Sequence, residues 1–258
     1  MLIKHISVIV IAKNSESTIK RTLDSLIEFE EVIVYDNGST DTTIQIAQQF
    51  PNVKVFQGEF KGFGWTKNKA ASYSKNDWVM IIDSDEVVNK DLVEYLKIKK
   101  LNKDTVYRLN SNGYYKDIKV KYCGWTLTVK RVYNKKTTSF NNEDEVHEHV
   151  LSDGLKEEVL EGSISHYSYH SISEFIIKAD RYSTLFAQNN ALKKSSSPTK
   201  AFFNGLYSFI KTYIFKQGFR DGYVGLIIAY SHMVTNFYKY IKLYEINKEY
   251  ETTNNKTR

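Results

Sequence analysis

Short apolar runs that alternate with segments of helical spacing are the feature that most constrains how this chain can fold. Almost wholly apolar runs cover residues 7–12, 31–36 and 78–83, and a shorter run covers 53–56. Such runs are typical of strands that are buried on both faces of a sheet. Segments with helical spacing separate them, at 17–27, 40–50 and 66–74. The alternation predicts βαβ units, and therefore an α/β fold built on a parallel sheet.

The pattern changes after Leu101. Short segments rich in Tyr, Val and Thr predict antiparallel strands added to that sheet; they cover 106–109, 119–122 and 128–133. From Ile172 onward the spacing is helical, with a break at 195–198, and the polar tail after Tyr250 is expected to be disordered. We therefore expect an α/β domain over residues 1–171 and a helical, basic and aromatic extension over 172–258.

Cysteine content and hydropathy limit the compartment and the kind of site. The single cysteine, Cys123, excludes an internal disulfide and a zinc site built from cysteines, and it fits a reducing cytosol. The sequence contains no uncharged apolar run of about eighteen residues, so no conventional membrane span is expected. The N-terminus leads directly into the first strand-like run, which predicts no signal peptide and a cytoplasmic location.

The positive charge of the chain is concentrated at its C-terminal end. The net charge is +6, yet residues 193–258 contain 11 Lys or Arg against four Asp or Glu. Apolar side chains recur there at helical spacing, as in Phe202, Leu206, Phe209 and Tyr213. Basic, aromatic amphipathic helices suit a membrane interface, although the same stripes can pack on the rest of the protein. Both interpretations stay open for different faces.

Three polar clusters follow the first, second and fourth strand-like runs, where ligands bind in open α/β sheets. They are residues 12–16, 36–41 and 83–86. Asp83, Asp85 and Glu86 bring carboxylates together, which is costly unless a cation compensates for the charge. Oxygen ligands suit Mg²⁺ or Mn²⁺, which commonly bridge a protein to a diphosphate. A solvated acidic turn is the alternative, which the two neighbouring polar strand ends make less attractive.

Taken together, these clusters resemble the family-2 glycosyltransferases, which have the GT-A fold, a Rossmann-like mixed sheet flanked by helices. The resemblance rests on Val-Ile-Val-Ile-Ala-Lys-Asn at 8–14, Val-Ile-Val-Tyr-Asp-Asn-Gly-Ser-Thr-Asp at 32–41 and Ile-Ile-Asp-Ser-Asp-Glu at 81–86. Residues 63–68, 146–148, 164–167 and 218–223 resemble a subgroup that adds glucose or related sugars to the core of lipopolysaccharide or lipooligosaccharide. The resemblance covers most of residues 6–245.

The resemblance implies a role for each residue of the clusters. Asp36 would accept a hydrogen bond from uracil, Ala12 and Asn14 would line the nucleotide, and Glu16 would lie near the ribose. Lys67 would face the diphosphate as a point charge, in a position where the subgroup often has Arg. Asp83 would contact the ribose or the metal, and Asp85 would bind the metal, Mn²⁺ or Mg²⁺.

The family's inverting mechanism needs a general base for the acceptor hydroxyl. The acid-rich stretch 142–148 is the expected source, with Glu148 as the base and Asp144 as its substitute; a solvated acidic loop is the alternative. His166 is expected to be a further contact for the metal or the diphosphate. Arg131 would lie near the diphosphate or the acceptor.

The resemblance implies an inverting glycosyltransferase that moves a hexose, glucose or galactose, from a UDP-sugar to a lipid-anchored glycan. The acceptor would be the lipooligosaccharide core or another cell-surface polysaccharide. The enzyme would be peripheral on the inner face of the cell membrane, bound through its C-terminal helices, and a homodimer is compatible with this picture. The alternative is a nucleotide-sugar-binding protein of the same fold that has lost catalysis. No nucleic-acid-binding module is visible, so a nucleic-acid partner is not expected.

Overall fold

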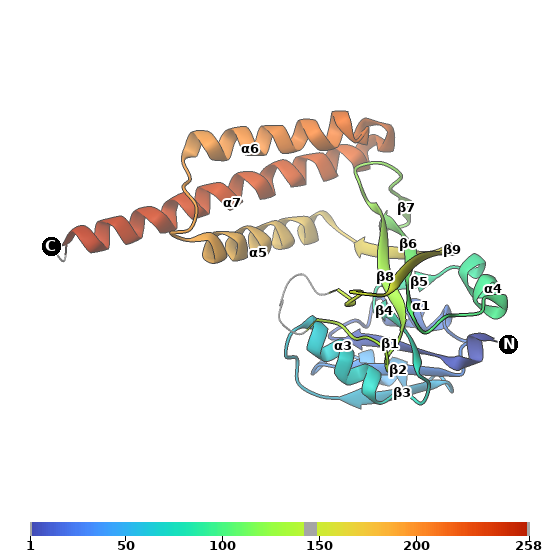
Figure 1. The fold of residues 1–258 in the computed structure, drawn as a ribbon. Coiled ribbons are helices and arrows are strands. Elements are labelled where there is room, and N and C mark those ends of the chain that lie inside the picture. The colour runs from blue at the N-terminus through green and yellow to red at the C-terminus, as the bar shows by residue number, and fades with distance from the viewer. Residues whose placement is uncertain (1, 142–148, 257–258) are drawn as a thin grey trace. The chain divides into compact units, whose positions relative to one another are not determined.

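In the computed structural model, residues 2–141 and 149–256 are described, and their strands form one mixed sheet (Figure 1). Its order is β3-β2-β1-β4-β8-β6-β9-β5, with β7 paired to β6. The strands are β1 (Ile6–Ala12), β2 (Glu31–Asp36), β3 (Val53–Gln57), β4 (Trp78–Asp83), β5 (Glu86–Val88), β6 (Thr105–Tyr115), β7 (Ile118–Lys119), β8 (Thr126–Asn134) and β9 (Lys156–Tyr169).

Strands β1 to β4 form the parallel part of the sheet. Val8 of β1 lies opposite Val32 of β2 on one side and opposite Met80 of β4 on the other. β1 and β2 are buried along their whole length, as their apolar sequences predict. β8 joins β4 in the antiparallel direction, and β5 pairs with β9 in the same way. The predicted mixed sheet is therefore confirmed.

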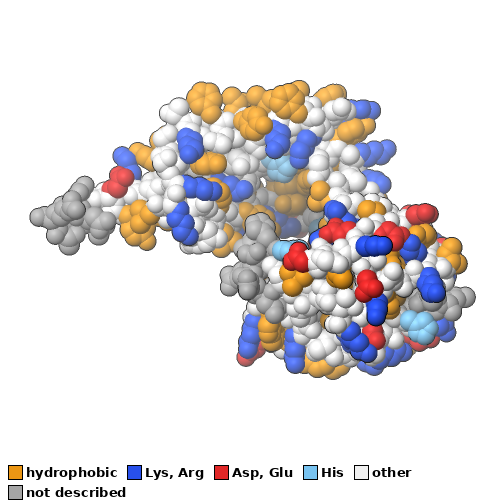
Figure 2. Space-filling view, viewed as in Figure 1, with side chains coloured by type: hydrophobic (Ala, Val, Ile, Leu, Met, Phe, Trp, Pro, Cys, Tyr) orange, Lys and Arg blue, Asp and Glu red, His pale blue; other side chains and the backbone are white. Residues whose placement is uncertain are grey.

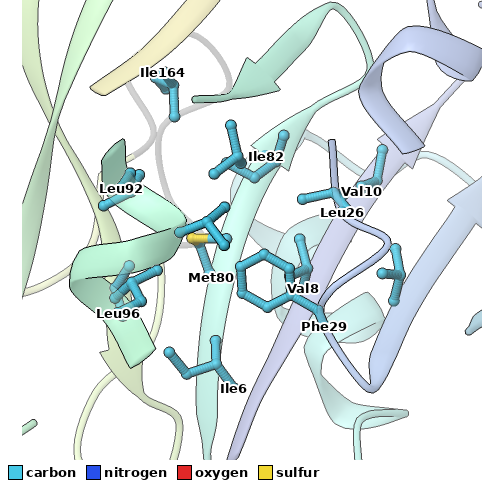
Figure 3. Packing of buried hydrophobic residues seen from close by; sticks show 14 of the residues in the cluster. Ile6, Val8, Val10, Leu26, Phe29, Met80, Ile82, Leu92, Leu96 and Ile164 are labelled. Carbon is cyan, nitrogen blue, oxygen red and sulfur yellow. The ribbon is translucent and has the colours of Figure 1, made fainter. Parts of the chain in front are cut away.

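Helices cover both faces of the parallel strands, because successive side chains of a strand point to opposite faces. Val8 and Val10 pack in one apolar cluster with residues of α1 (Ile19–Asp24) and α4 (Lys90–Ile98), as Figure 3 shows for Leu92 and Leu96 of α4. Ile9 and Ile11 pack on the other face with α3 (Phe63–Ser72). The remaining helices of this region are the short η1 (Leu2–His5) and α2 (Thr43–Ala47).

The chain forms two compact units. The sheet unit comprises residues 1–112 and 127–166, and the helical unit comprises residues 113–126 and 167–258. The helical unit contains α5 (Ile172–Asn190), α6 (Pro198–Ile210), the π-helix η2 (Lys211–Phe215), the 3₁₀-helix η3 (Gly218–Asp221) and α7 (Gly222–Lys256). The expected division of the chain at residues 171 and 172 stays a prediction.

Within the helical unit, the predicted break between helices at 195–198 is confirmed. The prediction of a disordered tail after Tyr250 is wrong. α5 ends at Asn190 and α6 begins at Pro198, where the Ser197 hydroxyl accepts a hydrogen bond from the Lys200 backbone N–H. Such a cap satisfies one of the amide groups left over at a helix start. The polar segment after Tyr250 is helical, since α7 continues to Lys256. None of the described helices is long and apolar enough to span a bilayer.

Candidate active site

The three polar clusters of the sequence lie at the carboxyl ends of three adjacent strands. Ala12 at the end of β1 is in register with Asp36 at the end of β2. On the other side of β1, Ile11 is in register with Asp83 at the end of β4. Parallel register thus brings residues 12–16, 36–41 and 83–86 to the same edge of the sheet, where ligands of α/β proteins bind.

Hydrogen bonds join the loops after β1 and β2. The Asn14 backbone N–H donates to the Ser39 hydroxyl at 2.8 Å, and the Asn14 side-chain oxygen accepts from the Thr40 N–H at 2.8 Å. The Glu16 carboxylate accepts from the Thr42 hydroxyl, also at 2.8 Å. Asn14 and Glu16 therefore hold the two loops together, and both remain exposed to solvent.

Asp36 is the last residue of β2 and is completely buried. Its carboxylate accepts hydrogen bonds from the backbone N–H groups of Gly38 and Ser39, both at 3.0 Å, and from the Ser39 hydroxyl. Gly38 has φ +85°, a conformation that glycine adopts without strain. Asp36 consequently fixes the turn at residues 37–40. A nucleobase such as uracil would reach its carboxylate only if that turn moved.

Asp83 lies between two cations. An Arg131 Nη2 donates to Asp83 Oδ2 at 2.6 Å, and Lys67 Nζ lies 3.6 Å from Asp83 Oδ1. Lys67 is 2% exposed, so α3 brings a lysine into the protein interior beside this carboxylate. Although burial opposes the charged form, Arg131 and Lys67 hold the pKa of Asp83 far below its usual value.

Glu86 belongs to the same cluster, although the family resemblance implies no separate role for it. It is 1% exposed; Oε1 accepts from Arg131 at 2.8 Å and Oε2 accepts from the Asp83 backbone N–H at 2.9 Å. Burial raises the pKa of Glu86, and the neighbouring Asp83 carboxylate adds to the rise against the opposing charge of Arg131. Only its position in the Asp-Ser-Asp-Glu motif marks it in the sequence.

Asp85 pairs with His166 across the β5–β9 ladder. Residue 86 of β5 is in register with His166 of β9, which brings His166 Nε2 to 3.4 Å from Asp85 Oδ2. Although burial opposes the charged imidazolium, the hydrogen bond and charge of Asp85, with Glu86 and Asp83 nearby, raise the pKa of His166 to about 9. The structure therefore places His166 beside the expected metal-binding carboxylate.

The oxygen and nitrogen atoms of this cluster fit a divalent ion whose coordination a diphosphate would complete. Among the residues that the structure describes, no three His, Cys, Asp or Glu side chains are grouped to hold a metal by themselves. Mg²⁺, however, is commonly bound by one or two carboxylates together with phosphate oxygens of a substrate. Asp83 and Asp85 offer such oxygens, and His166 offers a nitrogen of the kind that Mn²⁺ accepts once the ring is neutral.

The expected general base Glu148 and its substitute Asp144 lie in 142–148, outside the described residues.

An apolar groove of about 940 Å³ lies between α5 and α7 of the helical unit, lined by residues such as Phe175, Leu226 and Tyr230. It contains none of the polar clusters, so we do not assign it to the nucleotide.

Comparison with known proteins identifies the family of this chain. The family model described as glycosyl transferase family 2 matches residues 7–155. An uncharacterized glycosyltransferase of Rickettsia typhi is 30% identical, and the alignment covers 95% of this chain and 88% of that protein. The lipopolysaccharide core biosynthesis glycosyltransferase LpsC of Rhizobium meliloti is 24% identical over 93% of this chain and 92% of that protein. S. aureus TarS in complex with UDP-GlcNAc is a similar solved structure, with a TM-score of 0.49 and 17% identity over 96% of this chain and 92% of that chain.

The matched residues include all three strand-end clusters and Arg131. The mixed sheet with helices on both faces and a C-terminal helical extension is the GT-A fold that the motifs imply. With more than half of its length matched by the family model, this chain belongs to glycosyl transferase family 2.

Proposed function

We propose that this protein is an inverting hexosyltransferase that moves glucose or galactose from a UDP-sugar to a lipid-anchored glycan. The observation that carries the proposal is the cluster of Lys67, Arg131, Asp83, Asp85 and His166 at the carboxyl edge of the sheet. Two buried cations beside a pair of carboxylates suit a diphosphate that arrives together with a divalent ion.

The nucleotide would bind over the joined loops after β1 and β2. Ala12 and Asn14 would line the base and ribose, with Glu16 near the ribose hydroxyls. Asp36 would accept from the uracil N–H after a shift of its own turn, since three donors of that turn already bind its carboxylate. Each carboxylate oxygen accepts two hydrogen bonds, so Asp36 keeps capacity for a further donor.

The diphosphate would bind beside β4. Lys67 offers a point charge, and Arg131 offers a planar guanidinium held by Asp83 and Glu86. Asp83 and Asp85 would hold Mn²⁺ or Mg²⁺, with His166 as a further contact. When bound, such an ion neutralises charge on the leaving diphosphate.

Inversion requires one displacement at the anomeric carbon, with a base that takes the proton of the acceptor hydroxyl. Glu148 is the proposed base and Asp144 its substitute. The acceptor would be the lipooligosaccharide core or a related cell-surface glycan, in keeping with the similarity to LpsC. A lipid anchor on the acceptor would place the reaction at the inner face of the cell membrane.

A donor screen tests the proposal. Purified protein is incubated with UDP-glucose, UDP-galactose and UDP-N-acetyl sugars in the presence of Mn²⁺, and released UDP is measured with and without lipooligosaccharide acceptor. Asp85→Asn should abolish metal-stimulated turnover, whereas Asp24→Asn, which changes an exposed carboxylate of α1, should leave it unchanged. Glu148→Gln should retain UDP binding and lose transfer.

The outcomes separate the enzyme from its alternative. UDP binding without turnover of any donor would favour a binding protein that has lost catalysis. Undiminished Mn²⁺ dependence in Asp85→Asn would reject its role as a metal ligand, and normal transfer by Glu148→Gln would move the base to Asp144 or elsewhere.

A further inference from the structure

In helix α6 the small residues are buried and the large apolar residues are exposed, which is the reverse of an ordinary amphipathic helix. Its buried residues are the small Ala201 and Gly205. Its large apolar residues are exposed, with Phe203 at 60%, Tyr207 at 58% and Ile210 at 37%. In a helix that serves a protein core, the large apolar side chains face inward.

Close packing between α6 and α7 explains why small residues face inward. A Cβ atom at Gly205 would lie 3.1 Å from the Met233 carbonyl oxygen and 3.2 Å from Phe237 Cβ. The two helices are therefore too close for a large side chain at this point. The bulky residues of α6 consequently lie on its outer side, where Figure 2 shows apolar side chains gathered along the helical unit.

The exposed apolar surface continues from α6 into η2. Ile214 is 50% exposed and Phe215 is 68% exposed. We call Phe203, Tyr207, Ile210, Ile214 and Phe215 the α6 outer face. Contiguous exposed apolar surface of this kind marks an interaction site, because isolated exposed apolar residues are ordinary but adjacent ones are not.

The charge of the segment that forms the α6 outer face favours an anionic partner. Residues 198–220, which include α6 and η2, contain four Lys or Arg and no Asp or Glu. Lys211, which begins η2, and Lys216, which follows it, are both exposed. Two copies of this chain meeting through this face would bring two strongly positive segments together, which is unfavourable. An anionic surface would instead be attracted, and aromatic and aliphatic side chains beside lysines suit the boundary between lipid headgroups and acyl chains.

We infer that the α6 outer face seats in the headgroup region of an anionic lipid bilayer, with Lys211 and Lys216 contacting lipid phosphates. This inference extends the proposed function, because it names the surface by which the enzyme reaches a lipid-anchored acceptor. The apolar residues enter the interface, and the surrounding positive charge selects anionic over neutral lipid. No spanning segment is required for such binding.

Vesicle sedimentation tests the inference with the full-length protein and with neither donor nor acceptor present. Vesicles of phosphatidylcholine alone are compared with vesicles that also contain phosphatidylglycerol. Phe203→Ser combined with Phe215→Ser should weaken binding to the anionic vesicles at least about tenfold. The control combines Ile98→Ser with Ile177→Ser, two apolar residues that are 78% and 65% exposed elsewhere, and should bind as the wild type does.

A charge variant provides the second measurement and avoids changes in apolar packing. Lys211→Gln combined with Lys216→Gln should weaken binding to anionic vesicles about 25-fold, since each lysine near such a surface contributes about fivefold. Its control is Lys20→Gln combined with Lys90→Gln, two exposed lysines of the sheet unit. Circular dichroism confirms that each variant is helical, and UDP titration of the same samples reports the active site separately.

Selective binding to anionic vesicles that only the two α6-face variants lose would support the inference. Equal binding to neutral vesicles, or equal losses in the controls, would overturn it. The inference would also be overturned if the wild type does not bind vesicles but forms a dimer, and Phe203→Ser combined with Phe215→Ser dissociates that dimer. If the wild type does not bind UDP, that result would count against the proposed function. The vesicle measurement would still report membrane binding separately.

Discussion

Replacing Arg131 by methionine should strongly destabilise the sheet unit. The guanidinium of Arg131 binds Asp83 at 2.6 Å and Glu86 at 2.8 Å, and Glu86 is 1% exposed. Removing one partner of a buried ion pair leaves an uncompensated charge, which typically costs about 3–5 kcal/mol. Because the Asp83 side chain is 32% exposed and Lys67 remains beside it, we expect the lower end of that range, about 3 kcal/mol.

The assay is urea unfolding at pH 7, followed by tryptophan fluorescence, with Arg108→Gln as the matched control. Arg108 pairs with Glu157 at 3.6 Å and donates to the carbonyl and hydroxyl of exposed Thr128 at 3.0 and 2.6 Å. Because both side chains of the ion pair are about one-third exposed, the loss of Arg108 should cost less than about 2 kcal/mol. Adding Glu86→Gln to Arg131→Met should recover part of the loss, because the buried charge is then gone.

Acidity gives an independent check of the same reasoning. Burial already raises the pKa of Glu86, and removal of Arg131 raises it further, so Glu86 takes up a proton in the variant as the pH falls. The stability difference between Arg131→Met and the wild type should therefore shrink below pH 7. A loss as small as that of Arg108→Gln, unchanged by pH, would show that water screens Glu86 and would refute the argument.

Three further predictions concern other parts of the sheet unit. In thermal unfolding, Gly162→Ala should destabilise the protein by about 2 kcal/mol or more, because its Cβ would lie 2.5 Å from the Leu92 backbone. Gly154→Ala, also at positive φ but with nothing within 4 Å of its Cβ, should cost less. Glu31→Gln should lower stability by about 1–2 kcal/mol at pH 7. Although burial opposes its charge, hydrogen bonds from Lys54 and Ser7 keep the pKa of Glu31 below 4.5, so this difference should persist above pH 4.5 and vanish in more acidic solution. Lys67→Gln should weaken UDP binding about tenfold in calorimetric titration and leave uridine binding unchanged, because uridine has no phosphates; equal losses for both ligands would contradict a diphosphate contact.

The parallel half of the sheet could be predicted from sequence because its strands are apolar at nearly every position. That signal identifies β1, β2 and β4, and their order along the chain then predicts that Asn14, Asp36 and Asp83 lie at or just after the ends of strands of one sheet. The antiparallel half carries a weaker signal. β9 spans fourteen residues and alternates irregularly between exposed and buried positions, so no periodic pattern marks it.

The internal pairing of the site could not be predicted, because it depends on contacts between residues far apart in sequence. Asp85 and His166 meet only through the register of β5 with β9. Arg131 was singled out by resemblance, but its hydrogen bond to buried Glu86 follows from the approach of β8 to β4. Electrostatics in such a cluster depend on burial, which the order of residues alone does not give.

The helical unit shows a different limit of sequence reasoning. Helical periodicity groups Phe202 with Leu206 on one side of α6, yet it does not say whether that side faces inward. In the structure both residues are exposed, at 53% and 36%, and the small residues are buried instead. The small size of Ala201 and Gly205, each one position before Phe202 and Leu206, was the available signal.

The pairing of β5 with β9 also limits how this chain can change in length. Side chains along a strand alternate between faces, so one inserted or deleted residue between Val88 and the end of β9 that shifted the β5–β9 register would turn His166 to the opposite face, away from Asp85. Indels are consequently expected to accumulate in the connecting loops of homologous chains, where they leave this register intact. The spacing within residues 156–166 should be among the most invariant lengths in an alignment, even where the residues themselves differ.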